Sequence, residues 1–178
     1  MRYVALLRAV NVGGRKVTMK ELKAAAEDLG YDNVRTFIAS GNLVFDTKKT
    51  ADAKLETTLE SAIESTFGLF SEVMVRNPDE WAAIIKANPF PKKAKDDPAH
   101  LVCIVCKTAP DARAIDAWLE GFRAKYDKGE KLKVVGREVY VDYGDSIGES
   151  KLALPKKLVT GTARNWNSIL KLNAMLND

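Results

Sequence analysis

The residues best placed to do chemistry begin near the start of the chain, in LLRAVNVGGRKVTMKEL (6–22). An apolar, strand-like stretch runs into the pair Gly13 and Gly14, then into two bases, Arg15 and Lys16, before a helix begins. A helix start attracts anions because its first backbone amides have no partner within the helix. The spacing is neither that of the Walker phosphate loop nor that of the dinucleotide fingerprint. The segment is therefore either an anion cradle or a flexible loop with solvated bases.

A second candidate anion site is TARNWNSILKL (162–172). Thr162 is a natural helix cap, which predicts Arg164 and Asn165 in the first turn. An exposed arginine at a helix start opposes the helix dipole at a cost of about 0.3–1 kcal/mol, and a bound anion would reverse that sign. Alternatively, Trp166 anchors the helix in the core and Arg164 pairs with a carboxylate elsewhere. The sequence favours neither reading.

The loop YGDSIGESKL (143–152) is the third candidate. Ser150 and Lys151 are suited to hold an oxyanion, but Asp145 and Glu149 would repel one. The same two acids are too few to hold a hard metal ion, which takes at least six oxygen ligands.

Metal and nucleophile chemistry have little support elsewhere. Cys103 and Cys106 form a C-x-x-C, but they lie in the β-branched run HLVCIVCK, and residues three apart on a strand point to opposite faces. They are predicted to be buried structural cysteines. His100 is the one histidine and follows a proline-rich stretch. The sequence contains no G-x-S-x-G elbow and no H-E-x-x-H, so we expect no metal and no cofactor, and we assign no catalytic residue.

Hydrophobic periodicity predicts β-α-β-β-α-β order in the first half. Thr18 and Glu21 form a capping box for the first helix, and Ser40–Gly41–Asn42 joins two strands in a short hairpin. The expected strands are 2–8, 33–39, 42–47 and 71–76. A further short helix begins at Pro78 with Asn77 as its cap.

The second half repeats this theme less completely. A strand at 101–106, a helix capped by Thr108 and a hairpin about Gly136–Arg137 are followed by a weak helix at 150–161 and a strong one from 162, with no final strand. The predicted fold is α+β, with two ferredoxin-like (α/β plait) subdomains, the second modified, as in a structural duplication. The predicted bounds are 1–88 for the first unit with its short helix, 89–99 for a linker, and 100–178 for the second unit with its C-terminal helix.

Composition is that of an ordinary globular protein. The 178 residues are 46% hydrophobic and 29% charged, and no apolar run approaches the roughly 20 residues of a membrane-spanning helix. The N-terminus lacks the pattern of a signal peptide, so we expect a cytoplasmic protein. A net charge of +4 and a pI near 9.0 permit an acidic partner but do not require one.

Four motifs in order, RYVALLRAVNVGG, NVRTFIASGNLVF, SKL and TARNWNSILKL, resemble those of the bacterial family catalogued as domain of unknown function 1697. The resemblance spans nearly the whole chain and implies a pair of α/β plait subdomains. It implies no established activity, substrate or cofactor. Two residues depart from the family pattern: Ala9 stands where glycine is usual, and Glu149 where a base is common. The positions that match the motifs are Arg8, Asn11, Gly13, Gly14, Ser40, Gly41, Asn42, Ser150, Lys151, Arg164, Asn165 and Trp166.

The leading functional hypothesis is a soluble module that binds a phosphorylated or otherwise anionic small molecule, or nucleic acid. The rival hypotheses are a small-molecule enzyme that uses Arg, Lys, Asn and Ser on an anionic substrate, and a protein-interaction domain with Trp81 or Trp166 as an exposed anchor. The anion hypothesis supposes that NVGG and RNWN meet in one concavity. Oligomeric state is left open. The predicted ligand-binding residues are Arg8, Asn11, Gly13, Gly14, Ser40, Asn42, Ser150, Lys151, Arg164 and Asn165.

Overall fold

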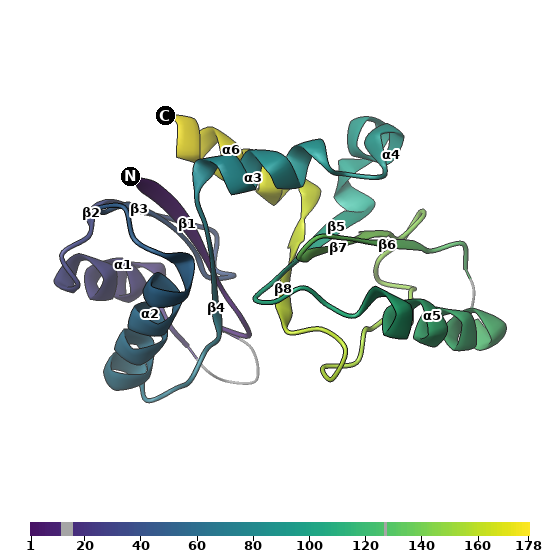
Figure 1. The fold of residues 1–178 in the computed structure, drawn as a ribbon, viewed down its shortest axis with the longest axis horizontal. Helices are drawn as coiled ribbons and strands as arrows, with labels where there is room; N and C mark the ends of the chain where they lie inside the picture. Colours follow the sequence, from purple (N-terminus) through teal and green to yellow (C-terminus); the bar gives the residue numbers. More distant parts are fainter. Residues whose placement is uncertain (12–15, 127) are drawn as a thin grey trace. The chain divides into compact units, whose positions relative to one another are not determined.

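The computed structural model describes residues 1–11, 16–126 and 128–178. The chain divides into two compact units, seen in Figure 1: a first unit of Met1–Ala83 with Lys171–Asp178, and a second unit of Ile84–Leu170. Each unit contains one four-stranded antiparallel sheet with helices, so the predicted α+β fold with two subdomains is confirmed. Within the described residues, no helix combines the length and apolarity that crossing a bilayer requires.

The first unit has the predicted β-α-β-β-α-β order, and its strands lie in the ferredoxin-like order β2-β3-β1-β4. Figure 1 shows α1 and α2 on the same side of this sheet. The elements are β1 (Arg2–Leu7), α1 (Met19–Asp28), β2 (Asp32–Phe37), β3 (Asn42–Asp46), α2 (Asp52–Phe67), β4 (Val73–Arg76) and α3 (Pro78–Lys86), whose last residues pass into the second unit.

Local signals explain these elements. The predicted capping box of α1 is present: Glu21 N donates to Thr18 Oγ1 at 3.2 Å, and Thr18 N donates to the Glu21 carboxylate at 3.0 Å. The apolar stripe of α2 and the inward side of the sheet then form one core. Its buried members include Tyr3, Leu7, Leu22, Leu43, Phe45, Leu55, Leu59, Ile63, Val73 and Val75.

The second unit has the same strand order in its own sheet, β6-β7-β5-β8. Its helix α5 packs Ile115, Leu119 and Phe122 against the sheet. The elements are α4 (Pro91–Asp96), the 3₁₀ helix η1 (Pro98–His100), β5 (Leu101–Cys106), α5 (Ala112–Tyr126), β6 (Lys131–Val135), β7 (Glu138–Asp142), β8 (Gly161–Asn165) and the start of α6 (Trp166–Asn177), whose residues from Lys171 belong to the first unit.

The final strand of the second unit is where the sequence prediction was wrong. Thr162 does not cap a helix, because residues 161–165 form β8 and pair with β5 along its length. Thr162 and Arg164 are buried and Ala163 is exposed, which is the period of a strand. Asn165 ends the strand, and its Oδ1 accepts from Asn167 N at 3.0 Å as α6 begins.

Three smaller predictions also differ from the structure. The segment 89–99, predicted as a linker, contains α4 and part of η1. Asp111, rather than Thr108, caps α5, since its carboxylate accepts from Arg113 N and Ala114 N at 3.0 and 3.1 Å. The weak helix predicted at 150–161 is an irregular segment with one turn, and its Leu152 and Val159 complete the core over the sheet. Pro155 in its middle disfavours a helix.

The two cysteines behave as predicted. Cys103 and Cys106 are both free and fully buried on β5, where Cys106 belongs to the α5 side of the core.

The hairpin glycine Gly41 provides a test of close packing. Its φ is +77°, and an added Cβ would lie 2.9 Å from Leu7 Cβ, whereas Gly30 has a φ of +78° with nothing within 4 Å of an added Cβ. We expect Gly41→Ala to lower the free energy of unfolding by about 1–3 kcal/mol more than Gly30→Ala, because only the first change overpacks the core. Urea denaturation followed by circular dichroism measures the difference. Equal losses of unfolding free energy in the two variants would show that the close approach to Leu7 does not affect stability.

The pair Arg2–Asp46 predicts a specific acid sensitivity. Arg2 Nε donates to Asp46 Oδ1 at 2.8 Å across β1 and β3, and Asn33 Nδ2 donates to Asp46 Oδ2 at 2.8 Å. The hydrogen bond from Arg2 is the main cause that lowers the pKa of Asp46, although burial opposes it. A lowered folded-state pKa stabilises the fold above the unfolded value of about 3.9, and this contribution disappears as the pH falls through the folded pKa.

We therefore expect Asp46→Asn to cost about 1 kcal/mol of unfolding free energy at pH 7 and progressively less as the pH falls below about 4. Denaturation midpoints from pH 3 to 7 measure this. Asp116→Asn, a change at an exposed position on α5, is the control and should show a small difference at every pH. A deficit in Asp46→Asn that did not change with pH would contradict the ionic role.

Candidate functional site

The first unit contains an open cavity of about 680 Å³. It lies where β2 and α2 begin and β3 ends, at the edge of the sheet. Small-molecule sites usually have volumes of roughly 300–1,000 Å³, so this one is large enough for a metabolite. Its described lining is Met1, Leu29, Gly30, Tyr31, Asp32, Asp46, Thr47, Lys48, Thr50, Lys54, Leu55 and Thr58.

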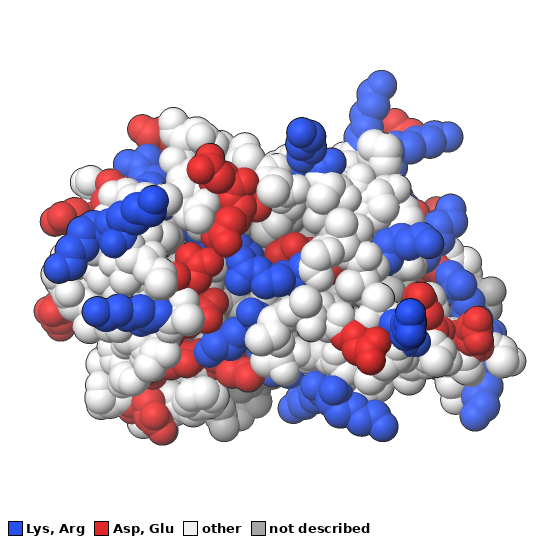
Figure 2. All heavy atoms as spheres, in the orientation of Figure 1, with Lys and Arg blue, Asp and Glu red and all other residues white. Residues whose placement is uncertain are grey.

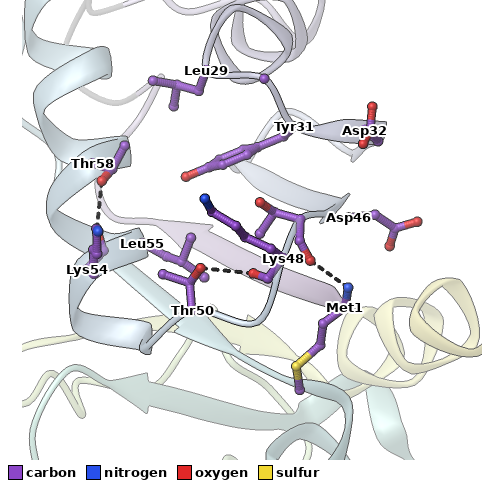
Figure 3. Close-up of a pocket in the computed structure, with 12 residues that line it drawn as sticks. Met1, Leu29, Tyr31, Asp32, Asp46, Lys48, Thr50, Lys54, Leu55 and Thr58 are labelled. Atoms are coloured by element: carbon purple, nitrogen blue, oxygen red, sulfur yellow. Dashed lines mark hydrogen bonds between the residues drawn. The ribbon is translucent and has the colours of Figure 1, made fainter.

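The Tyr31 hydroxyl is the most informative group in the cavity. The side chain is 9% exposed, and its ring stacks on Phe45 with centroids 4.4 Å apart. The hydroxyl has no hydrogen-bond partner among the described residues, whereas every fully buried side-chain nitrogen or oxygen in that part of the chain has one. The oxygen therefore opens into the cavity, as Figure 3 shows. Burial raises the pKa of Tyr31, so at neutral pH the phenol keeps its proton and can donate.

Two lysines face the same space. Lys48 follows β3, and Lys54 lies in the first turn of α2. Neither makes an ion pair with a carboxylate in the described part of the chain. Figure 3 shows Lys48 extending from the wall opposite Tyr31, with Thr58 on the α2 side. The Lys48 ammonium and the Tyr31 phenol thus point into a single opening, which Lys54 also lines from α2.

The acids at the cavity do not cancel this charge. In Figure 3, Asp32 and Asp46 point away from the centre of the cavity. Asp46 is already satisfied by Arg2 and Asn33. Leu29 and Leu55 add apolar groups to the lining. The arrangement can therefore donate hydrogen bonds and positive charge to the oxygens of a ligand, and can shelter an apolar part of it.

The predicted residues of the first unit lie at the opposite end of the sheet. Strand β1 pairs Arg2 with Asp46 at the cavity end and Leu6 with Asn42 at the other. At that second end, Asn11 Nδ2 donates to Ala39 O at 2.8 Å, which joins the loop after β1 to the β2–β3 hairpin. The structure thus brings together Arg8, Asn11, Ser40 and Asn42, while Gly13 and Gly14, with Arg15, lie outside the described residues.

The described members of this group bind to the chain itself. The Arg8 guanidinium pairs with Glu72, and Asn11 Oδ1 accepts from Val17 N at 2.7 Å. Asn42 is fully buried and donates to Phe37 O at 2.8 Å and to Ser40 Oγ at 3.0 Å. These contacts hold a strained loop end, because Ala9, Asn11 and Ile38 all have positive φ angles.

In the second unit, Ser150 and Lys151 have different environments. Ser150 Oγ donates to Glu130 Oε1 at 2.5 Å, so the hydroxyl fixes its own loop. Lys151 is exposed, and its Nζ lies 4.9 Å from the centroid of the Tyr126 ring. Lys151 is thus available to an anion in a way that Ser150 is not.

Arg164 and Asn165 also make internal contacts. Arg164 is 5% exposed, and its Nη1 donates to Thr162 Oγ1 at 2.7 Å and to Ala163 O at 2.9 Å. Burial lowers the pKa of Arg164 to about 10. Asn165 Nδ2 donates to Ala99 O at 2.6 Å. Both residues belong to the second unit, whereas the loop after β1 belongs to the first.

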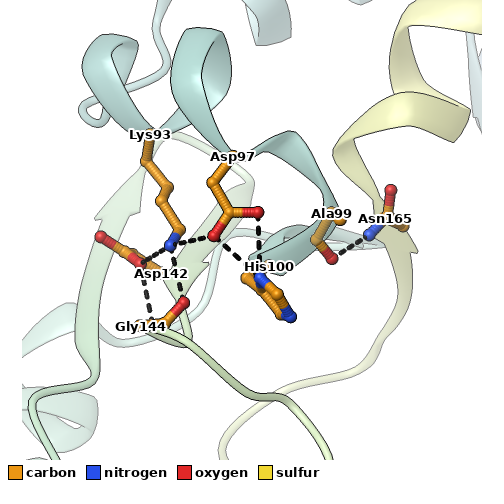
Figure 4. Close-up of polar contacts among 7 residues, drawn as sticks. All are labelled: Lys93, Asp97, Ala99, His100, Asp142, Gly144 and Asn165. Carbon is orange, nitrogen blue, oxygen red and sulfur yellow. Dashed lines mark hydrogen bonds and ion pairs between the residues drawn. The ribbon is translucent and has the colours of Figure 1, made fainter.

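A second polar cluster, shown in Figure 4, ties the segment predicted as a linker to β7. Lys93 Nζ donates to Asp97 Oδ2 at 2.7 Å and to Gly144 O at 2.6 Å, and lies 3.6 Å from Asp142. His100 Nδ1 lies 2.8 Å from Asp97 Oδ2. The hydrogen bond from Lys93, then that from His100, lowers the pKa of Asp97. Because these charges satisfy one another, the cluster is best understood as a clamp.

The cavity residues were not found from the sequence. Tyr31, Lys48, Lys54 and Thr58 come from separate elements, so no short motif contains them. The one local signal is Lys48–Lys49–Thr50 just before α2, a helix that begins at Asp52 and whose N-cap residue, Ala51, makes no side-chain cap hydrogen bond. Two bases before an uncapped helix start favour an anion at that position.

Comparisons with known proteins agree on the fold. The solved structure of a conserved bacterial protein, SP0830 from Streptococcus pneumoniae, superposes with a TM-score of 0.74 at 23% sequence identity, over 98% of each chain. At that identity the likeness shows the fold alone. No curated protein matches the sequence. Residues 1–140 match the family described as "Protein of unknown function (DUF1697)". Because that match covers most of the chain, the protein belongs to the DUF1697 family.

Proposed function

We propose that the cavity of the first unit binds a small phosphorylated or otherwise anionic molecule. The observation that carries this proposal is the Tyr31 hydroxyl, the accessible tip of an otherwise nearly buried residue, which opens into the cavity without a partner in the described structure. A polar group in such a place loses hydrogen bonds that water or a ligand must supply. A ligand oxygen would accept from this phenol.

The charge around the phenol selects the class of ligand. Lys48 and Lys54 supply two ammonium groups that have no carboxylate partner in the described residues. Hydrogen bonds between charged partners contribute about 1.5–3 kcal/mol each, roughly twice as much as neutral ones. A phosphate monoester offers several charged oxygens to three donors at once. The apolar side chains of Leu29 and Leu55 in the lining then favour an ester with an organic body over inorganic phosphate alone.

The two rival hypotheses have less support from the described contacts. Trp81 and Trp166 are 0% and 3% exposed, so neither is available as the surface anchor of a protein-interaction domain. The enzyme hypothesis has Arg164 and Asn165 orient an anionic substrate and Lys151 or Ser150 act on it. Arg164 and Ser150 instead donate to partners within their own unit, and of the two reactive candidates only Lys151 is exposed. Binding at the cavity requires no change in any of these contacts.

Binding of phosphate esters tests the proposal. We expect glycerol phosphate, glucose 6-phosphate or AMP to bind in calorimetric titrations, and the corresponding uncharged alcohol or nucleoside to bind at least tenfold more weakly. Lys48→Gln and Lys54→Gln should each lower the affinity about tenfold, because each removes one charged donor. Lys20→Gln removes an exposed lysine from α1 and should leave the affinity unchanged.

Tyr31→Phe is the sharpest variant because it deletes one oxygen and keeps the ring on Phe45. It should weaken ester binding about tenfold while the unliganded protein stays as stable as before or becomes slightly more stable, since the oxygen has no internal partner to lose. Equal affinity of Tyr31→Phe and the original protein, or equal binding of esters and their uncharged parents, would refute the proposal.

A further inference from the structure

A small cleft in the second unit joins three lysines to one exposed aromatic ring. Lys125, Tyr126, Lys128 and Lys151 line an opening of about 290 Å³, which we call the lysine–tyrosine cleft. The Tyr126 ring is 46% exposed, and Lys151 Nζ stands over it, 4.9 Å from its centroid. The neighbouring Phe122 ring, 5.7 Å away and tilted by 44°, supports Tyr126 from the core.

The cleft is held in place by a buried carboxylate. Glu130 is 3% exposed; its Oε2 accepts from Lys128 N at 2.9 Å, and its Oε1 accepts from Ser150 Oγ at 2.5 Å. Burial by itself would raise the pKa of Glu130, but the hydrogen bonds from Ser150 and from backbone amides outweigh it and lower that pKa. One ionised side chain therefore fixes both segments that carry the lysines. On the rim, Lys128 Nζ also lies 3.7 Å from the exposed Glu149.

The positive charge of the protein is concentrated in this unit. Residues 84–170 contain 16 of the 28 Lys and Arg residues and 11 of the 24 Asp and Glu residues, a net charge of +5, which leaves −1 for the first unit. On the face that Figure 2 shows, bases and acids are interspersed and form no single basic field. Attraction of an anion to this unit must therefore depend on local groups of lysines.

Two further lysines of this unit, Lys131 and Lys133, lie on the other face of the sheet. They alternate on β6 with the buried Leu132, which packs in the core beneath α5, so they face away from the cleft. Lys131 lines a separate opening beside Asp97 and Asp142. The cleft itself therefore offers three lysines around one ring, which suits a nucleobase with its neighbouring phosphates.

From this geometry we propose that the lysine–tyrosine cleft binds single-stranded nucleic acid. One base stacks on Tyr126 in place of the Lys151 ammonium, which moves to a phosphate. Lys125 contacts a neighbouring phosphate, and Lys128 exchanges its exposed partner Glu149 for another phosphate. Aromatic stacking of this kind contributes about 1–3 kcal/mol per base and tolerates any sequence. A duplex binds more weakly because its bases are already stacked on one another. The ligand and the site both differ from those proposed for the first unit.

Fluorescence anisotropy with a labelled 20-nucleotide oligothymidylate tests this assignment over 50–200 mM KCl. With about three phosphates contacted, the affinity should fall roughly 20-fold across that range, because each contact releases about 0.7 of a counterion from a single strand. The triple variant Lys125→Gln, Lys128→Gln, Lys151→Gln should lose this dependence almost completely. Tyr126→Leu should lower the affinity about tenfold at constant salt, with little change in the salt slope.

The control removes the same charge elsewhere in the unit: Lys86→Gln, Lys156→Gln, Lys157→Gln, all at exposed positions. It should keep most of the affinity and the salt slope. Loss of binding in this control equal to that in the cleft variant would overturn the assignment, as would the absence of oligonucleotide binding at 50 mM KCl. AMP that displaced the labelled oligonucleotide from the cleft with the same affinity as unlabelled oligonucleotide would also overturn it. Tyr31→Phe should bind the oligonucleotide normally, which separates this result from the first proposal.

Discussion

The pairing of β1 on both of its edges is the constraint on which the first unit depends. β1 lies between β3 and β4, and its residues from Tyr3 to Leu7 are almost wholly buried. A strand that is hydrogen-bonded on both edges and buried on both faces cannot shift its register by one residue without moving its apolar side chains out of their packing. Its register therefore fixes both ends of the sheet. At the Arg2 end the elements enclose a cavity, and at the Leu7 end Leu7 N donates to Gly41 O at 2.8 Å and closes the hairpin onto the strand.

The two ends of the sheet differ in the partners of their polar side chains. This difference distinguishes the structural end from the end that carries the candidate site. At the Leu7 end, Asn11 and Asn42 satisfy backbone atoms of their own loops, so their chemistry is used in holding positive-φ residues in place. At the cavity end, the Tyr31 oxygen is left for a partner outside the described chain. The Tyr31 oxygen is not itself fully buried, so water or a ligand in the cavity can reach it. A motif rich in Asn and Gly can thus mark a backbone with positive φ angles, while the candidate ligand site lies where no motif is visible.

The sequence predicted most of the fold because its signals are local. Capping boxes, apolar stripes and turn glycines identified α1, α2, α5 and both hairpins, since each acts over a few residues. β8 was not predicted because its five residues show only a short alternation of buried and exposed side chains, and because Thr162 resembles a helix cap. α4 was not predicted because proline and clustered charge are typical of a linker. In the structure, Lys93 of this helix donates hydrogen bonds to Asp97 and to Gly144 of a loop distant in the sequence. The cavity depends on Tyr31, Lys48 and Lys54, whose approach is set by sheet register and helix packing, so no spacing rule could identify it.

Electrostatics in this protein act over short distances, and this links the two proposed sites. At physiological ionic strength exposed charges are screened beyond about 8 Å, so the net charge of a whole unit contributes little at any one point. What matters is whether nearby lysines are already paired. Lys93 is neutralised by Asp97 and Asp142 and attracts nothing further. Lys48, Lys54 and Lys125 make no ion pair in the described residues, and each lines an opening that a tyrosine also lines. An ammonium group and an aromatic hydroxyl or ring in one opening, without a paired carboxylate, can recognise the charge and the shape of an anion together, and both proposals rest on that combination.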